Sequence, residues 1–149
     1  MVEKVTIRVA TCKDLPEILQ LHGQTDMDNG QVVSLSEAES IFERTKEYPN
    51  YQIYVACHNG KTLGSFALLI MDNLAHMGAR SGIVEDVVVA PEWQGQGIGK
   101  QMMQFAMQKC REARCYKLVL SSNKKRHKAH RFYQGLGFEE HGYSFVVII

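Results

Sequence analysis

The chain of 149 residues is long enough to bury a substantial core, and we expect a single domain over residues 1–149. Hydrophobic residues make up 45% of the chain and charged residues 22%, which is ordinary for a globular protein. The net charge of +1 argues against a dedicated nucleic-acid-binding protein, and no apolar run is long enough to span a bilayer.

The first half of the chain predicts strands and capped helices. Alternating apolar and polar residues over 5–9 predict a strand. Thr11 is a capping residue at the start of a helix, and Ser34 or Ser36 starts a second helix that runs to about Lys46. Residues 51–57 and 62–71 predict a hairpin around Asn59-Gly60, a strong turn signal.

The second half continues this mixed α/β pattern. A polar connection over 72–82 leads to a nearly continuous apolar strand at 83–89, which suits the centre of a sheet. A helix over about 97–113, a strand at 117–121 and a helix over about 127–136 follow. The apolar segment 143–149 predicts a further strand, as part of a last hairpin.

Between the strand at 83–89 and the next helix lies a turn with three alternating glycines. Glycines allow backbone N–H groups to converge on one point, and the positive end of the helix dipole faces the same point. This order predicts a cradle for a diphosphate. The predicted cradle consists of Gln94, Gly95, Gln96, Gly97, Ile98, Gly99 and Lys100.

Two common nucleotide-binding motifs fit this turn poorly. A P-loop requires Ser or Thr after its lysine, and Lys100 is followed by Gln101. A Rossmann fingerprint requires G-x-G-x-x-G and an acidic residue about twenty positions later, where this chain has Lys117 and Leu118. The diphosphate therefore belongs to another ligand.

The motif Gln94-x-x-Gly97-x-Gly99 resembles the acetyl-coenzyme A motif of the GNAT superfamily of N-acetyltransferases. Residues 129–138, A-H-R-F-Y-Q-G-L-G-F, resemble the next signature of that family, and residues 7–14 resemble its usual start. The resemblance spans nearly the whole chain. It implies a mixed, mostly antiparallel sheet flanked by helices on both faces. It also implies acetyl-CoA as the acetyl donor, a small-molecule primary amine as the acceptor, and a homodimer.

Several cofactor contacts are implied by this resemblance. The pantetheine arm would pair with the backbone of Val87, Val88 and Val89, and an N–H near Val88 would polarise the thioester carbonyl. The family commonly has Asn where this chain has Arg126, and Asn123 lies near enough in sequence to substitute. The other expected cofactor contacts near the second motif are His130 and Phe132.

Glu85 and Asp86 are candidates for the base that removes a proton from the acceptor amine. Carboxylates within an apolar strand lose solvation, so a role is expected for them, although a structural salt bridge is the alternative. Because neighbours on a strand face opposite sides, one of the two is expected to reach the substrate. Tyr133 is the candidate acid, since a phenol can protonate a departing thiolate.

The basic run 124–128 has more than one interpretation, and the cysteines indicate no special site. The basic run 124–128 is a solvated loop, or it contacts the cofactor's 3′-phosphate or an anionic acceptor. The cysteines lack C-x-x-C spacing, so we expect free thiols, no metal site and a cytoplasmic location. The alternatives are a protein N-terminal or lysine acetyltransferase, and a CoA-binding sensor without turnover.

Overall fold

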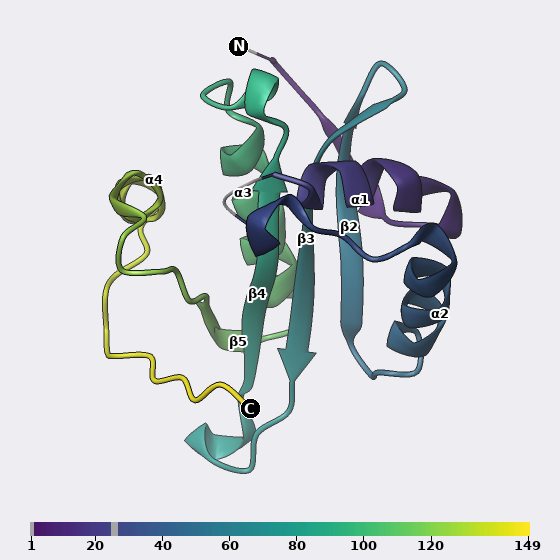
Figure 1. The fold of residues 1–149 in the computed structure, drawn as a ribbon. Helices are drawn as coiled ribbons and strands as arrows, with labels where there is room; N and C mark the ends of the chain where they lie inside the picture. The colour runs from purple at the N-terminus through teal and green to yellow at the C-terminus, as the bar shows by residue number, and fades with distance from the viewer. Residues whose placement is uncertain (1, 25–26) are drawn as a thin grey trace. The chain divides into compact units, whose positions relative to one another are not determined.

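One sheet with strand order β1-β2-β3-β4-β5 organises the chain up to Val119 (Figure 1). The computed structural model describes residues 2–24 and 27–149. The β1–β2, β2–β3 and β3–β4 pairs are antiparallel and the β4–β5 pair is parallel, so the predicted mixed, mostly antiparallel sheet is confirmed. The strands are β1 (Thr6–Val9), β2 (Tyr51–His58), β3 (Lys61–Met71), β4 (Arg80–Val89) and β5 (Cys115–Val119).

Helices cover both faces of this sheet, as predicted (Figure 1). On one face lie α1 (Leu15–His22) and α2 (Leu35–Thr45), where Ile18 and Phe42 form a buried cluster with Val55 of β2. The other face is covered by α3 (Ile98–Glu112). The buried side chains of α3 are Ile98, Met102, Met103, Ala106 and Cys110.

Local signals in the sequence explain the turn and the cap that were predicted. Asn59 and Gly60 both have positive φ, 49° and 75°, as the two-residue turn of a twisted hairpin requires. The Ser34 side chain accepts a hydrogen bond from the Glu37 N–H at 3.2 Å, so Ser34 and not Ser36 caps α2.

Two strands differ from the predicted ones by more than one residue at a boundary. Residues 80–82 belong to β4 and not to the preceding loop, and β5 lies at Cys115–Val119 instead of 117–121. The reason is their parallel pairing, in which Arg80 lies opposite Cys115. Polar Arg80 and Ser81 gave no apolar signal, so only the partner strand defines this part of β4.

A partly buried ion pair between Arg8 and Asp14 fixes the start of the first helical segment, and it gives a testable prediction. The Arg8 guanidinium donates to both carboxylate oxygens of Asp14, at 2.7 and 2.8 Å, and the Thr11 N–H donates at 2.7 Å. Chiefly because of Arg8, the pKa of Asp14 falls from 3.8 to about 2. Because folding lowers the pKa of Asp14, this carboxylate stabilises the fold at pH values above its pKa in the unfolded chain. The contribution is lost as the pH falls through about 2.

We therefore expect Asp14→Asn to lower the free energy of unfolding by about 2 kcal/mol at neutral pH. Urea unfolding of the variant and the parent, repeated from pH 7 downward, measures this difference. The difference should shrink as the pH falls from about 4 toward 2. A difference that stays constant over that range contradicts the assignment.

From Leu120 onward the chain forms a second compact unit, which contains α4 (His127–Gly135) and a tail. The predicted helix is confirmed, but the predicted strand at 143–149 is wrong. Phe145 and Ile148 are 91 and 86% exposed, and within the described part of this unit no strand pairs with the tail. High β-propensity alone does not form a strand without a partner backbone. The single domain over residues 1–149 stays a prediction.

Candidate cofactor and acyl-transfer site

β4 is paired on both sides only along its first part. Its register with β5 ends where Ile83 meets Val119, whereas β3 continues opposite β4 as far as Val89. Within the described chain, residues 84–89 therefore have no β5 partner, and the backbone groups on this edge are left without a strand partner. The Val89 carbonyl is the exception to their availability, since it accepts from the Gln24 and Gln94 side chains. The predicted cofactor contacts Val87, Val88 and Val89 all lie in this open stretch.

A β-bulge interrupts β4 at the predicted acidic pair. Ala67 pairs with Glu85 and Ser65 pairs with Val88, so the single residue between them on β3 faces both Asp86 and Val87. Asp86 adopts a left-handed backbone with a φ of 53°. Regular alternation stops here, so it no longer decides which side Asp86 faces, and the prediction that the two carboxylates face opposite sides stays a prediction.

The register across the sheet places Glu85 on the face covered by α1 and α2. Glu85 pairs with Ala67, which pairs with Ile53, and Ile53 packs on the buried cluster under those helices. Directly opposite residues share a face of the sheet. Both Glu85 and Asp86 are exposed, so the desolvation expected from the sequence does not arise.

Sequence reasoning did not single out Tyr51 of β2, which interacts electrostatically with both Glu85 and Asp86. Burial raises the pKa of Tyr51, and the negative charges of Asp86 and Glu85 raise it further. Its phenol is therefore protonated at neutral pH. The Tyr48 ring meets Tyr51 edge-on at 5.9 Å. The available signal was the period of β2, which puts Tyr51 on the same face as Ile53.

The glycine turn leads from β4 into α3 through a short 3₁₀ segment, Pro91–Trp93. Gly95 and Gly97 have positive φ values of 75° and 84°, which glycine adopts without strain. The first α-helical bond runs from the Gln101 N–H to the Gly97 carbonyl at 3.1 Å. The N–H groups of residues 98–100 precede that bond and have no acceptor within the helix.

This turn fits a diphosphate. A Cβ added to Gly95 would meet no described atom within 4 Å, so the space beside this residue of the turn is open. The Gln94 and Gln24 amides both donate to the Val89 carbonyl, at 3.1 and 3.0 Å, and fasten the turn to the end of β4. Unsatisfied N–H groups and the positive end of a helix dipole together favour an anion.

The second unit contains the candidate acid. The Tyr133 ring lies 5.1 Å from the Phe132 ring and 5.6 Å from the Phe138 ring. Burial raises the pKa of Tyr133, and the positive charge of Arg126 opposes this shift in part. The phenol is therefore protonated at neutral pH, as a proton donor must be.

Asn123 and His130 shape the loop before α4. The Asn123 side-chain oxygen accepts the Lys125 N–H at 2.9 Å, and the Asn123 carbonyl lies 2.8 Å from His130 Nε2. Because a carbonyl only accepts, Nε2 carries the proton. Residues 124–128 are all exposed. The predicted cofactor contacts of Asn123, Arg126, His130 and Phe132 stay predictions.

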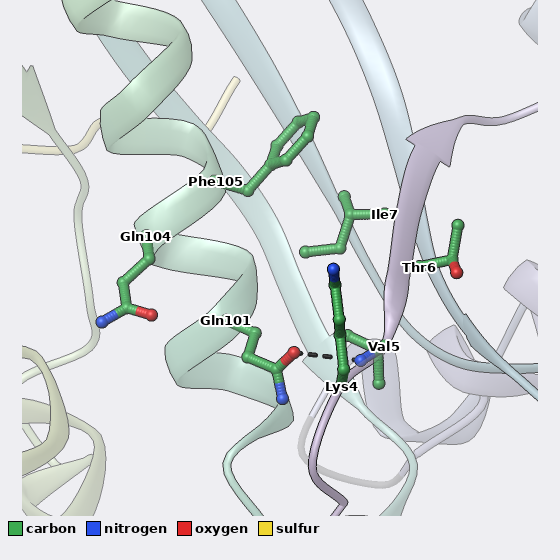
Figure 2. Close-up of a pocket in the computed structure, with 7 residues that line it drawn as sticks. All are labelled: Lys4, Val5, Thr6, Ile7, Gln101, Gln104 and Phe105. Atoms are coloured by element: carbon green, nitrogen blue, oxygen red, sulfur yellow. Dashed lines mark hydrogen bonds between the residues drawn. The ribbon is translucent and has the colours of Figure 1, made fainter.

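A shallow cavity of about 480 Å³ lies elsewhere, between β1 and α3 (Figure 2). Its lining residues are Lys4, Val5, Thr6, Ile7, Gln101, Gln104 and Phe105. Since none of the predicted catalytic or cofactor-binding residues lines it, we do not assign it to acyl transfer. Over residues 2–24 and 27–149, no cluster of three or more His, Cys, Asp or Glu side chains is arranged to hold a metal ion. Every helix in the same ranges is too short or too polar to cross a bilayer.

Comparison with known proteins places this arrangement in a family. The model of the acetyltransferase (GNAT) family matches residues 16–138. Glucosamine 6-phosphate N-acetyltransferase of Trypanosoma brucei brucei is 37% identical over 89 residues, which cover 58% of each chain. Aminoalkylphosphonate N-acetyltransferase of Salmonella typhimurium is 34% identical over 97 residues, which cover 65% of this chain and 62% of that protein. The alignments thus span about three fifths of these curated relatives.

The fold agrees with this match. The crystal structure of a Trypanosoma brucei acetyltransferase superposes with a TM-score of 0.83 and 28% identity, covering 98% of this chain and 100% of that one. The matched family region contains both predicted motifs, the glycine turn and residues 129–138. The chain belongs to the GNAT acetyltransferase family.

Proposed function

We propose that this chain is an acetyl-CoA-dependent N-acetyltransferase, in which the primary amine of a small molecule attacks the thioester directly. The observation that carries the proposal is the open edge of β4 at residues 84–89, which runs into the glycine turn at the start of α3. A ligand that joins an amide-containing arm to a diphosphate fits this order. Its amides pair with the strand edge, and its diphosphate meets the N–H groups of the turn.

The backbone supplies the groups that hold the donor and stabilise charge. Bound acetyl-CoA supplies the thioester that is to be cleaved. A backbone N–H near Val88 donates to the thioester oxygen as negative charge develops there. The bulge at Asp86 and Val87 supports this role, because it releases the local backbone from its ladder with β3.

Glu85 and Asp86 remove the proton from the acceptor amine, directly or through water. An alkylammonium has a pKa of about 10.4, so at neutral pH the amine must lose a proton before it attacks. Glu85 is exposed, and it lies on the same face of the sheet as α1 and α2. Tyr133 then gives its proton to the departing thiolate, whose conjugate acid has a pKa of about 8.5.

We expect Glu85→Gln to lower kcat/KM for the amine roughly 100-fold at neutral pH, because the variant lacks a proton acceptor. The deficit should shrink as the pH approaches the pKa of the free amine, where the substrate deprotonates itself. Thiol release from pH 6.5 to 10 measures both effects, with Asp86→Asn as the test of the second carboxylate. Glu112→Gln, at the exposed end of α3, is the control. A deficit that does not change with pH contradicts the role of Glu85 as a base.

The proposed acceptor is an amine that bears a phosphate or phosphonate. Two relatives are named for glucosamine 6-phosphate and aminoalkylphosphonate, which share an amine and an anionic phosphorus group. The exposed basic run 124–128 offers positive charge for such a group, or for the 3′-phosphate of the cofactor. The relatives and the basic run support this substrate class without selecting one compound.

A thiol-release assay with acetyl-CoA tests the function against matched pairs of acceptors. Glucosamine is compared with glucosamine 6-phosphate, and ethanolamine with 2-aminoethylphosphonate. We expect turnover, with the phosphorus-bearing member of a pair preferred. Turnover of peptides alone supports a protein acetyltransferase instead. No turnover with any acceptor, together with tight CoA binding, supports a sensor module.

A homodimer is part of the proposal. The exposed apolar tail from Tyr143 to Ile149 favours self-association, because association would remove its side chains from water. Sedimentation at twice the mass of the chain is the expected result, and sedimentation at the monomer mass contradicts it. The cytoplasmic location and the lack of a nucleic-acid partner stay predictions.

A further inference from the structure

The side chain of Gln101, in the first turn of α3, joins that helix to the N-terminal segment, defined as residues 2–5 (Figure 2). Its Oε1 accepts the Val5 N–H at 3.0 Å, and its Nε2 donates to the Val2 carbonyl at 3.3 Å. One side-chain amide thus satisfies a donor and an acceptor of the same segment. Val2 and Val5 are buried, at 8 and 5% exposed, so the segment is itself held in place.

The N-terminal segment also contacts the glycine turn. The Val2 N–H donates to the Gln96 carbonyl at 3.4 Å. In a trans peptide the carbonyl and the following N–H point in opposite directions. This bond therefore turns the Gly97 N–H away from the N-terminal segment. The carbonyl of Gly97 is held in turn by the backbone N–H of Gln101, at 3.1 Å.

Gln101 therefore acts on both sides of the Gln96–Gly97 peptide. The backbone N–H of Gln101 holds the Gly97 carbonyl. The side chain of Gln101 holds the N-terminal segment, whose Val2 N–H binds the Gln96 carbonyl. A glycine turn has more backbone conformations than other sequences, so ordering it on binding would weaken a ligand's affinity. A turn that is already held avoids this loss.

We propose that Gln101 is a positioning residue for the cofactor diphosphate, because it ties residues 2–5 to the glycine turn and so presents the Gly97 N–H to the ligand. The inference rests on the proposed use of acetyl-CoA. It assigns Gln101 no contact with the ligand. Loss of the Gln101 amide therefore acts through the shape of the turn, and it acts only on ligands that carry a diphosphate.

The test compares Gln101→Met with Gln104→Met, which changes a glutamine one turn further along α3. In Figure 2 the Gln104 side chain extends away from Val5, and it is exposed. Calorimetry with CoA should show a Kd roughly 5- to 20-fold higher for Gln101→Met, as expected for the loss of two hydrogen bonds, and little change for Gln104→Met. At saturating acetyl-CoA, kcat should be unchanged.

S-acetylpantetheine, which lacks the diphosphate, separates positioning from general damage. Gln101→Met should lower kcat/KM for acetyl-CoA while leaving kcat/KM for S-acetylpantetheine near that of the parent. Equal loss with both donors, or no loss with either, overturns the inference. Should Gln101→Met fail to fold, Gln101→Asn replaces it, because its shorter amide cannot bond to both Val2 and Val5. If the parent chain itself does not bind CoA, the proposed function fails and the positioning role, which rests on it, falls with it. If the parent binds CoA and Gln101→Met binds it equally well, only the positioning role is overturned.

Discussion

Gly97→Val is expected to raise the Kd for CoA by at least roughly 100-fold, through the combined loss of turn geometry and anion contacts. Gly97 has a φ of 84° and immediately precedes the first residue of α3. A β-branched residue is strained at this φ and would pull the turn toward another backbone conformation. The N–H groups of residues 97–100 would then no longer converge on one point.

Gly60→Val is the matched control for this substitution. Gly60 has a φ of 75° and lies in the β2–β3 turn, where an added Cβ meets no atom within 4 Å. Both variants carry a similar backbone strain of about 1–2 kcal/mol, visible in thermal unfolding. Only Gly97→Val should lose CoA binding in calorimetry. Equal affinities in the two variants would show that the glycine turn is not the diphosphate site.

Tyr133→Phe is expected to lower kcat roughly 100- to 1,000-fold while leaving the Kd for CoA near that of the parent. The substitution removes the phenolic proton and keeps the ring that packs against Phe132 and Phe138. A catalyst loses its proton donor for the thiolate, whereas a CoA-binding sensor is indifferent to this change. Thiol release and calorimetry on the same preparation separate kcat from binding.

The pH dependence of the parent chain gives a second test of Tyr133. An acid must be protonated to act, so the limb of the pH profile that depends on Tyr133 should lie at alkaline pH, above the raised pKa of this phenol. Tyr133→Phe should lose that alkaline limb. Tyr143→Phe is the matched control, because Tyr143 belongs to the same unit and is 84% exposed. If Tyr143→Phe slows the enzyme as much as Tyr133→Phe does, the general acid lies elsewhere.

Features that depend on a few consecutive residues were predictable from the sequence. The Asn59-Gly60 turn and the Ser34 cap each depend on the backbone preferences of a few consecutive residues. The glycine turn belongs to the same class, since its order of strand, glycines and helix is local. The glycine turn is also one of the motifs that carry the resemblance to the family.

The open edge of β4 was not predictable, because it depends on where a distant strand stops. The pairing of β5 with β4 ends at Ile83, and the sequence of β4 does not indicate this end point. The bulge at Asp86 likewise depends on β3, whose Ser65 and Ala67 set the register on either side of it. Simple alternation consequently could not decide which side Asp86 faces.

Two further differences have the same physical origin. The side chain of Gln101 hydrogen-bonds to Val5 and Val2, which lie 96 and 99 positions earlier in the sequence. Its role therefore appears only when the N-terminal segment lies beside α3. The tail at 143–149 has the composition of a strand, yet a strand forms only where a partner backbone is supplied. Both cases depend on contacts between distant segments, on which local propensity has no bearing.

A crystal structure of this chain with acetyl-CoA is the most direct measurement of the central claim. We expect the diphosphate oxygens within hydrogen-bond distance of the backbone N–H groups between Gly97 and Lys100. The pantetheine amides should lie along the open edge of β4 at Val87–Val89. A diphosphate bound away from the glycine turn, or no density for the cofactor at saturating concentration, would contradict the account.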